Sequence, residues 1–88
     1  MILAAPKTVP IEGVGYVINA SMMDNLVALT GKKVTLTLDG GNALTGYIKV
    51  VGDQVVHLEK IERKEFFDSL IRIEKIQAIE MRFREYQR

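Results

Sequence analysis

Apolar residues alternate with polar ones through most of residues 31–83, and this pattern constrains the fold more than any other feature of the chain. In the segment 33–38, valine and leucine alternate with lysine and threonine, as in a strand with one buried face. Further alternating segments follow, separated by short polar or Gly-rich turns such as Asp39-Gly40-Gly41-Asn42. The pattern predicts consecutive antiparallel strands, with a combined length suited to one small barrel.

Five strands are expected, with a turn at 52–54, an exposed charged hairpin tip at 61–65 and a tight junction at Glu74-Lys75. Gly46 in the middle of the second strand favours a sharply bent strand, where neighbouring side chains need room. The predicted inner faces are Val34, Leu36 and Leu38; Leu44, Gly46, Ile48 and Val50; Val56 and Leu58; Phe67, Ser69, Ile71 and Ile73; and Ile79, Met81 and Phe83.

The period changes within residues 20–30, where apolar residues recur at helical spacing. Asn19 and Ser21 are both suitable N-caps, and Gly31 stands where a helix ends. We expect a helix of about nine residues across one opening of the barrel; an irregular arm is the alternative. Residues 1–19 form an extended N-terminal arm, 20–83 the barrel domain, and 84–88 a C-terminal tail that frays. The fold class is therefore mainly β: a short helix followed by a five-stranded, strongly bent antiparallel SH3-like barrel.

The composition of the 88 residues excludes several classes of function. Lys and Arg number 12 against 11 Asp and Glu, so the net charge of +1 requires no nucleic-acid partner in bulk. Cysteine is absent, which excludes disulfides and thiolate metal sites and fits a cytoplasmic protein. No apolar run reaches membrane-spanning length, and the first ten residues lack the basic start of a signal peptide.

No catalytic signature is visible: there is no Ser/His/Asp set, phosphate loop, metal cluster or paired-carboxylate cleft. His57 is the single histidine and is expected to face outward, in solvent or at an interface. We therefore expect a non-enzyme without cofactor, metal or small-molecule substrate. A domain this small gains stability from self-association, so a homo-oligomer is expected.

The chain resembles the Sm-like family, which includes bacterial Hfq and the Sm and LSm proteins. The resemblance rests on the alternating strand Val34-Thr35-Leu36-Thr37-Leu38, on Gly40-Gly41, on Gly46-Tyr47-Ile48, and on Leu70-Ile71-Arg72-Ile73-Glu74-Lys75-Ile76. It covers residues from about 20 to 83. The family's second motif has glycine where Ile73 stands, and the family's loop aspartate and asparagine are replaced by Gly52-Asp53-Gln54.

The resemblance implies two kinds of site. In the family, loop residues hold an RNA base and an arginine–glycine pair completes the pocket. The corresponding candidates for single-stranded RNA here are Gly52, Asp53, Gln54, Arg72 and Lys75. For Arg72 a salt bridge to a neighbouring Glu is the alternative role.

The family also implies a ring, closed by pairing the fifth strand of one subunit with the fourth strand of the next. The sequence adds its own reason, because both predicted edge strands lack a proline that would block pairing. The candidate interface residues are Phe67, Ser69, Ile71, Ile79, Met81 and Phe83.

Three functions are compatible with these features. The first is a ring that binds single-stranded RNA, rich in uridine or adenine, without catalysis. The second is an oligomeric structural or protein-interaction module of the same fold. The third is a monomeric SH3-like accessory domain of an RNA-processing or ribosomal assembly.

Overall fold

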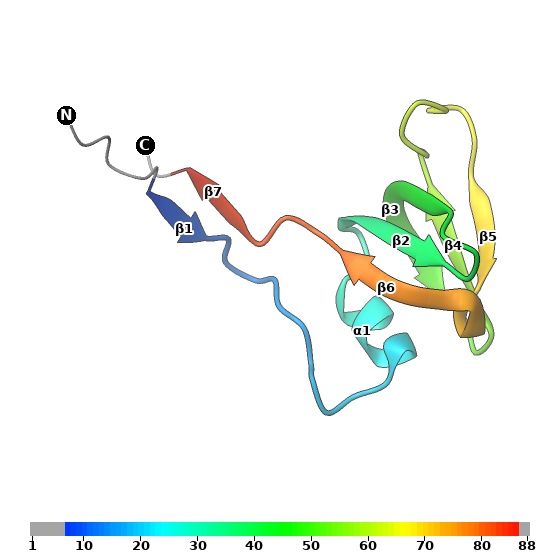
Figure 1. The fold of residues 1–88 in the computed structure, drawn as a ribbon, viewed down its shortest axis with the longest axis horizontal. Helices are drawn as coiled ribbons and strands as arrows, with labels where there is room; N and C mark the ends of the chain where they lie inside the picture. Colours follow the sequence, from blue (N-terminus) through cyan, green and yellow to red (C-terminus); the bar gives the residue numbers. More distant parts are fainter. Residues whose placement is uncertain (1–6, 87–88) are drawn as a thin grey trace.

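A computed structural model describes residues 7–86 of the chain. The elements run in the order β1 (Thr8–Pro10), α1 (Met22–Ala28), β2 (Lys33–Leu38), β3 (Ala43–Val51), β4 (Val55–Glu59), β5 (Ser69–Arg72), the 3-10 helix η1 (Ile73–Lys75), β6 (Ile76–Glu80) and β7 (Arg84–Tyr86) (Figure 1). One helix and antiparallel strands thus make up a mainly β chain, as the sequence predicts.

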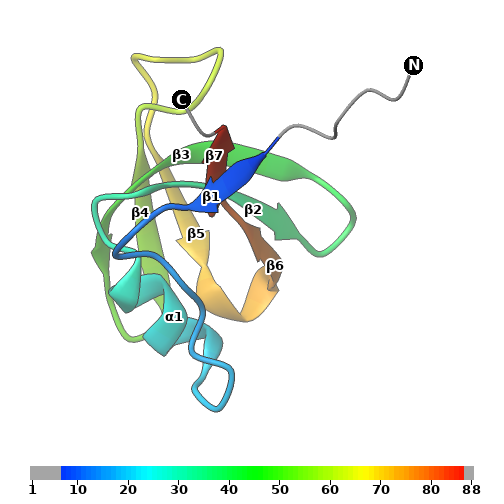
Figure 2. The ribbon, with the colours of Figure 1, turned by 90° about the vertical axis from the view of Figure 1, so that its left-hand side faces the viewer.

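The main sheet has five strands in the order β5-β4-β3-β2-β6, and every neighbouring pair is antiparallel. It is strongly curved, and α1 lies at one end of it (Figure 2). β5 and β6 each pair with a single neighbour, and no ladder joins them within the described residues. Closure of the predicted barrel is therefore not confirmed, and the sheet has two unpaired edges.

The helix α1 has seven residues rather than the predicted nine. Ser21 is its N-cap, with the side-chain Oγ accepting from the amide of Asp24 at 3.0 Å. Gly31 follows the helix with φ +84°, a conformation that glycine adopts without steric cost. Leu26 and Leu29 are buried, so the helix closes one end of the core with its apolar stripe.

The period of two predicts most of the core correctly. Alternate residues of β2 and β4 are almost completely inaccessible, because one face of each strand packs inward. The buried apolar residues are Leu26, Leu29, Val34, Leu36, Ile48, Val56, Leu58, Ile61, Ile71 and Ile76. Ile61 is the first residue of the tip at 61–65, so the prediction that this tip is exposed is wrong at that residue.

Two predicted inner-face positions are wrong, each where the ladder is interrupted, and one predicted strand is too long. Val50 is 56% exposed because the register between β3 and β4 shifts after Ile48, which reverses the alternation. Phe67 is 63% exposed because its amide donates to Lys64 O in a turn that ends before β5 begins. The last predicted strand is too long, since β6 ends at Glu80.

The two ends of the chain pair with each other. β1 and β7 form a separate two-stranded antiparallel sheet, which projects away from the main sheet (Figure 1). The prediction of a fraying tail is therefore wrong for residues 84–86, and residues 87–88 lie outside the described part. The sequence does not predict this pairing, because each strand has three residues and is too short to show an alternation of apolar and polar residues.

Gly46 lies where β3 passes close to its neighbours. A Cβ atom at this position would lie 2.7 Å from the backbone oxygen of Glu59, 3.0 Å from Leu58 Cγ and 3.2 Å from Ile61 Cδ1. The first of these neighbours is backbone and cannot rotate away, so any side chain would separate β3 from β4.

We expect Gly46→Ala to lower the free energy of unfolding by about 1–3 kcal/mol, the usual cost of overpacking a core. Urea denaturation at fixed protein concentration measures this. Gly15→Ala is the matched control, because no atom lies within 4 Å of the added Cβ and the glycine φ is not positive. Equal stability of both variants would contradict the close approach described at Gly46.

Candidate nucleic-acid interface

Two turns meet at one end of the main sheet. Residues 52–54 connect β3 to β4, and the 3-10 helix η1 follows β5. The turns are adjacent because β4 pairs with β5, with Val55 opposite Arg72. The amide of Ile73 donates to Gln54 O at 2.9 Å, and the amide of Gly52 donates to Val55 O at 2.8 Å. Main-chain bonds therefore fix the relative position of the two turns.

A cleft of about 610 Å³ lies between these turns. Three of the five predicted RNA-binding residues line it: Asp53, Gln54 and Arg72. Gly52 belongs to the same turn without lining the cleft. The remaining wall residues are Val55, Ile73 and Glu74.

Arg72 supplies the positive charge of the cleft. Its Nη1 atom lies 3.8 Å from Glu74 Oε1, and both side chains are more than 70% exposed. An ion pair this exposed contributes little free energy, so it does not prevent the guanidinium from contacting a ligand. Asp53 and Glu74 give two negative charges against one positive, so the cleft of one protomer carries a formal charge of −1. This charge favours contact with a base over contact with a phosphate.

Ile73 occupies the position where the resembled motif has glycine. It lines the cleft and also packs in part against the core. Its side chain therefore narrows the cleft while adding an apolar surface. A planar base can pack against such a surface, whereas a phosphate gains nothing from it.

Lys75 does not join the cleft. Its Nζ lies 3.9 Å from Asp39 Oδ2, and the same carboxylate accepts from Gln77 Nε2 at 2.9 Å. The amide of Asp39 also donates to the Lys75 carbonyl at 2.9 Å. Lys75 thus packs against the turn after β2.

The predicted interface residues are distributed over both unpaired edges. Ser69 and Ile71 lie on β5, although Ile71 is only 6% exposed and its side chain belongs to the core. On the other side Ile79, in β6, and Met81 are partly buried against the core. Phe83 stacks on Tyr16, with ring centroids 4.5 Å apart. Of the set, Phe67 is the most exposed.

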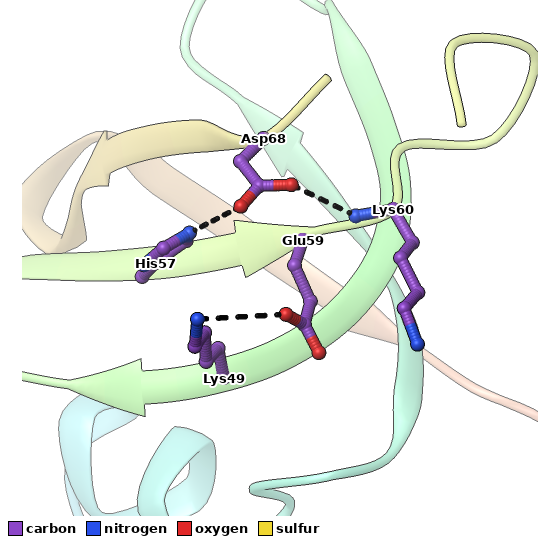
Figure 3. A network of polar contacts seen from close by, with 5 residues as sticks. All are labelled: Lys49, His57, Glu59, Lys60 and Asp68. Atoms are coloured by element: carbon purple, nitrogen blue, oxygen red, sulfur yellow. Dashed lines mark hydrogen bonds and ion pairs between the residues drawn. The ribbon is translucent and has the colours of Figure 1, made fainter. Parts of the chain in front are cut away.

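His57 lies on the outer side of β4 beside β5, within a polar network (Figure 3). Its Nε2 atom is 2.8 Å from Asp68 Oδ2, and the other Asp68 oxygen accepts from the amide of Lys60 at 3.2 Å. The backbone of Lys60 has φ +53°, which non-glycine residues seldom adopt, and the bond to the Asp68 carboxylate helps to hold it there. The network fastens the loop before β5 to the end of β4.

Sequence reasoning places His57 correctly on the outer side but misses Asp68. The partners are eleven residues apart, and their meeting depends on the length of the loop between them. In the sequence, a histidine and an aspartate on either side of the expected hairpin tip indicate such a contact, but this indication is weak. Among residues 7–86, no three His, Cys, Asp or Glu side chains are grouped to hold a metal ion. No helix in the described chain is long and apolar enough to cross a membrane.

Comparison with known proteins supports the assignment of the fold. The sequence matches no family model and no curated protein. The structure is similar to the crystal structure of an SmAP (LSm) protein from Methanococcus vannielii, with a TM-score of 0.58 and 26% sequence identity. The match covers all of that chain and 74% of this one. The chain has the Sm-like fold. About a quarter of this chain has no counterpart in that structure.

The hydrogen bond from His57 holds the pKa of the Asp68 carboxyl below its ordinary value of 3.8, and the bond from the Lys60 amide acts in the same direction. A lowered carboxyl pKa means that the contact stabilises the folded loop above pH 3.8 and is lost as the pH falls through the lower folded-state value. In an NMR titration, we expect the Asp68 carboxyl carbon and the Lys60 amide to share a midpoint below pH 3.8.

Asp68→Asn provides the control for this titration. The Lys60 amide should then lose the shared transition, because an amide side chain does not titrate. A midpoint at or above 3.8 in the unmodified protein would contradict the network as described.

Proposed function

We propose that copies of this chain close into a ring and that the ring binds single-stranded RNA, rich in uridine or adenine, without catalysis. The observation that carries this proposal is the cleft joining Asp53 and Gln54 to Arg72, in a chain with the Sm-like fold. The polar groups of the cleft are suited to hydrogen bonding with base edges, and Ile73 is suited to packing against a base.

The two unpaired edges support ring formation. The amide of Ile73 donates to the carbonyl oxygen of Gln54, the residue before β4. Because the direction of the peptide groups alternates along an antiparallel ladder, those of Leu70 and Arg72 then point toward the open side of β5. Neither β5 nor β6 contains proline. Within their bounds β5 carries one basic residue, Arg72, and β6 one acidic residue, Glu80, so the edges are complementary in charge. Pairing β5 of one copy with β6 of the next satisfies both edges at once.

A ring compensates for a weak site by repetition. Stacking of a base on an aromatic ring contributes about 1–3 kcal/mol. The residues that line this cleft include no aromatic side chain, so one cleft should bind a base more weakly than that, and the affinity depends on several clefts engaging one strand. The −1 charge of the cleft predicts that few phosphates are neutralised. The affinity should therefore depend on salt less steeply than that of a protein held mainly by phosphate contacts.

A second candidate function is an oligomeric structural or protein-interaction module that binds no RNA. Two observations favour it: Ile73 narrows the cleft where the resembled motif has glycine, and acidic residues outnumber basic ones there. The ring and the RNA site are therefore separate parts of the proposal, and each has its own test.

We expect Arg72→Ala to weaken binding of fluorescently labelled oligo-U or oligo-A by about tenfold, since the cleft loses a charged hydrogen-bond donor. Fluorescence anisotropy at several salt concentrations measures this. Arg63→Ala is the matched control, because Arg63 lies in the charged loop after β4, outside the cleft. Equal losses in both variants would indicate general charge attraction and reject the cleft. A protein that assembles but binds neither oligonucleotide would support the second candidate function, an oligomeric module without RNA.

We expect Leu70→Pro to prevent assembly while leaving the protomer folded. Proline removes an amide that points away from β4, so the β4–β5 ladder loses no bond. Analytical ultracentrifugation gives the mass, and a two-dimensional NMR spectrum reports folding. Leu70→Ala separates the two roles of the residue, because it removes an exposed side chain and keeps the amide. A folded Leu70→Pro protein of unchanged oligomeric mass would exclude β5 from the subunit interface.

A further inference from the structure

The N-terminal arm contacts the side of β6 that faces away from β2. The hydroxyl of Tyr16 donates to the carbonyl oxygen of Ile79 at 2.8 Å. The ring of Tyr16 packs on Phe83 with a centroid distance of 4.5 Å and an interplanar angle of 47°. Further along, the amide of Ile11 donates to the Phe83 carbonyl at 2.8 Å.

The carbonyl that Tyr16 contacts belongs to the open edge of the sheet. The amide of Leu38 donates to Asn42 O, across to the β3 side. In an antiparallel ladder the direction of the peptide groups alternates, so those of Leu36 also point to β3. Ile79 lies opposite Leu36, and its N–H and C=O therefore point away from β2. A strand added to β6 would pair with these same groups.

Asn25 of α1 holds the arm in the position that allows this contact. Its Oδ1 accepts from the amide of Val17 at 2.7 Å, and its Nδ2 donates to the Val17 carbonyl at 3.0 Å and to the Ser21 carbonyl at 2.9 Å. The side-chain amide thus satisfies both peptide groups of the residue next to Tyr16, as a neighbouring strand would. The position of Tyr16 is therefore set by the helix.

The contact leaves most of the edge uncovered. An open apolar groove of about 270 Å³ is lined by the arm, α1 and Ile79, and two of its arm residues, Val17 and Ile18, are 51% and 84% exposed. Gly13 and Gly15 lie in the arm on the N-terminal side of Tyr16. A Cβ atom added at either glycine would meet no atom within 4 Å, so the arm is loosely packed there. One hydroxyl and one aromatic contact can therefore be withdrawn without disturbing the core.

We infer that Tyr16 is a latch on the β6 edge, and that it competes with β5 of a second copy for the Ile79 carbonyl. This inference rests on the proposed ring, whose subunit contacts it regulates. When the latch is closed, the edge is one acceptor short for strand pairing. When the hydroxyl leaves, the carbonyl becomes available and assembly proceeds at lower protein concentration.

The test compares Tyr16→Phe with Tyr47→Phe. Both changes remove one tyrosine hydroxyl, and the two residues are similarly exposed, at 40% and 38%. Within the described residues, the structure gives the Tyr47 hydroxyl no hydrogen bond, so this variant is the matched control. Sedimentation velocity over a dilution series should place the assembly midpoint of Tyr16→Phe about fivefold below that of the wild type, the effect of one net hydrogen bond. Tyr47→Phe should follow the wild type.

Asn25→Ala tests the same latch by a different change. It removes the two hydrogen bonds that hold the peptide groups of Val17, and it leaves the Tyr16 hydroxyl in place. We expect its midpoint to shift in the same direction, with the Ile79 amide becoming protected from hydrogen exchange at lower protein concentration than in the wild type. Folding of each variant is checked by its NMR spectrum at the lowest concentration.

The outcomes distinguish the latch from the ring. If the wild type assembles and Tyr16→Phe assembles at the same or a higher concentration, the latch is wrong and the arm is neutral or part of the interface. If the wild type and every variant remain protomers at all concentrations, the ring is wrong and the latch has nothing to regulate.

Discussion

A curved sheet of five strands that does not close leaves unpaired peptide groups along its two edge strands. The other features of this molecule depend on that constraint. Gly46 allows β3 and β4 to approach closely enough to bend together, since a Cβ there would meet a backbone oxygen at 2.7 Å. The bend gives a small chain a core, but no ladder joins β5 to β6 in the described structure. Unpaired edges of this kind invite pairing with another chain unless something covers them.

The candidate RNA site depends on the same sheet. Pairing of β4 with β5 brings the turn at 52–54 beside η1, and a single main-chain bond from Ile73 to Gln54 fixes their relative position. The charged and polar side chains of the cleft are exposed and weakly paired, so the site is ordered mainly by its backbone. Such an arrangement tolerates changes of side chain. This explains how the glycine of the resembled motif can be replaced by Ile73 without loss of the fold.

The alternation of residue types predicts the parts of the structure in which the ladder is regular. It fails at Val50, where a shift of register reverses the inward and outward faces, and at Phe67, where a turn begins before the expected strand does. Three of the five predicted RNA-binding residues meet in one cleft, because both turns lie at the ends of correctly predicted strands. Contacts such as Tyr16 with Ile79, 63 positions apart, carry no periodic signal in the sequence.

The strength of the Tyr16 contact determines what it can do. A single neutral hydrogen bond contributes about 0.5–1.5 kcal/mol net, whereas an added strand forms several such bonds and also buries apolar side chains. The latch therefore cannot prevent pairing of complementary edges at high concentration. It can reduce pairing in dilute protein, where an uncovered edge could otherwise pair with any extended chain. A weak contact held in place by Asn25 is suited to this role, because a tighter cover would also exclude the correct partner.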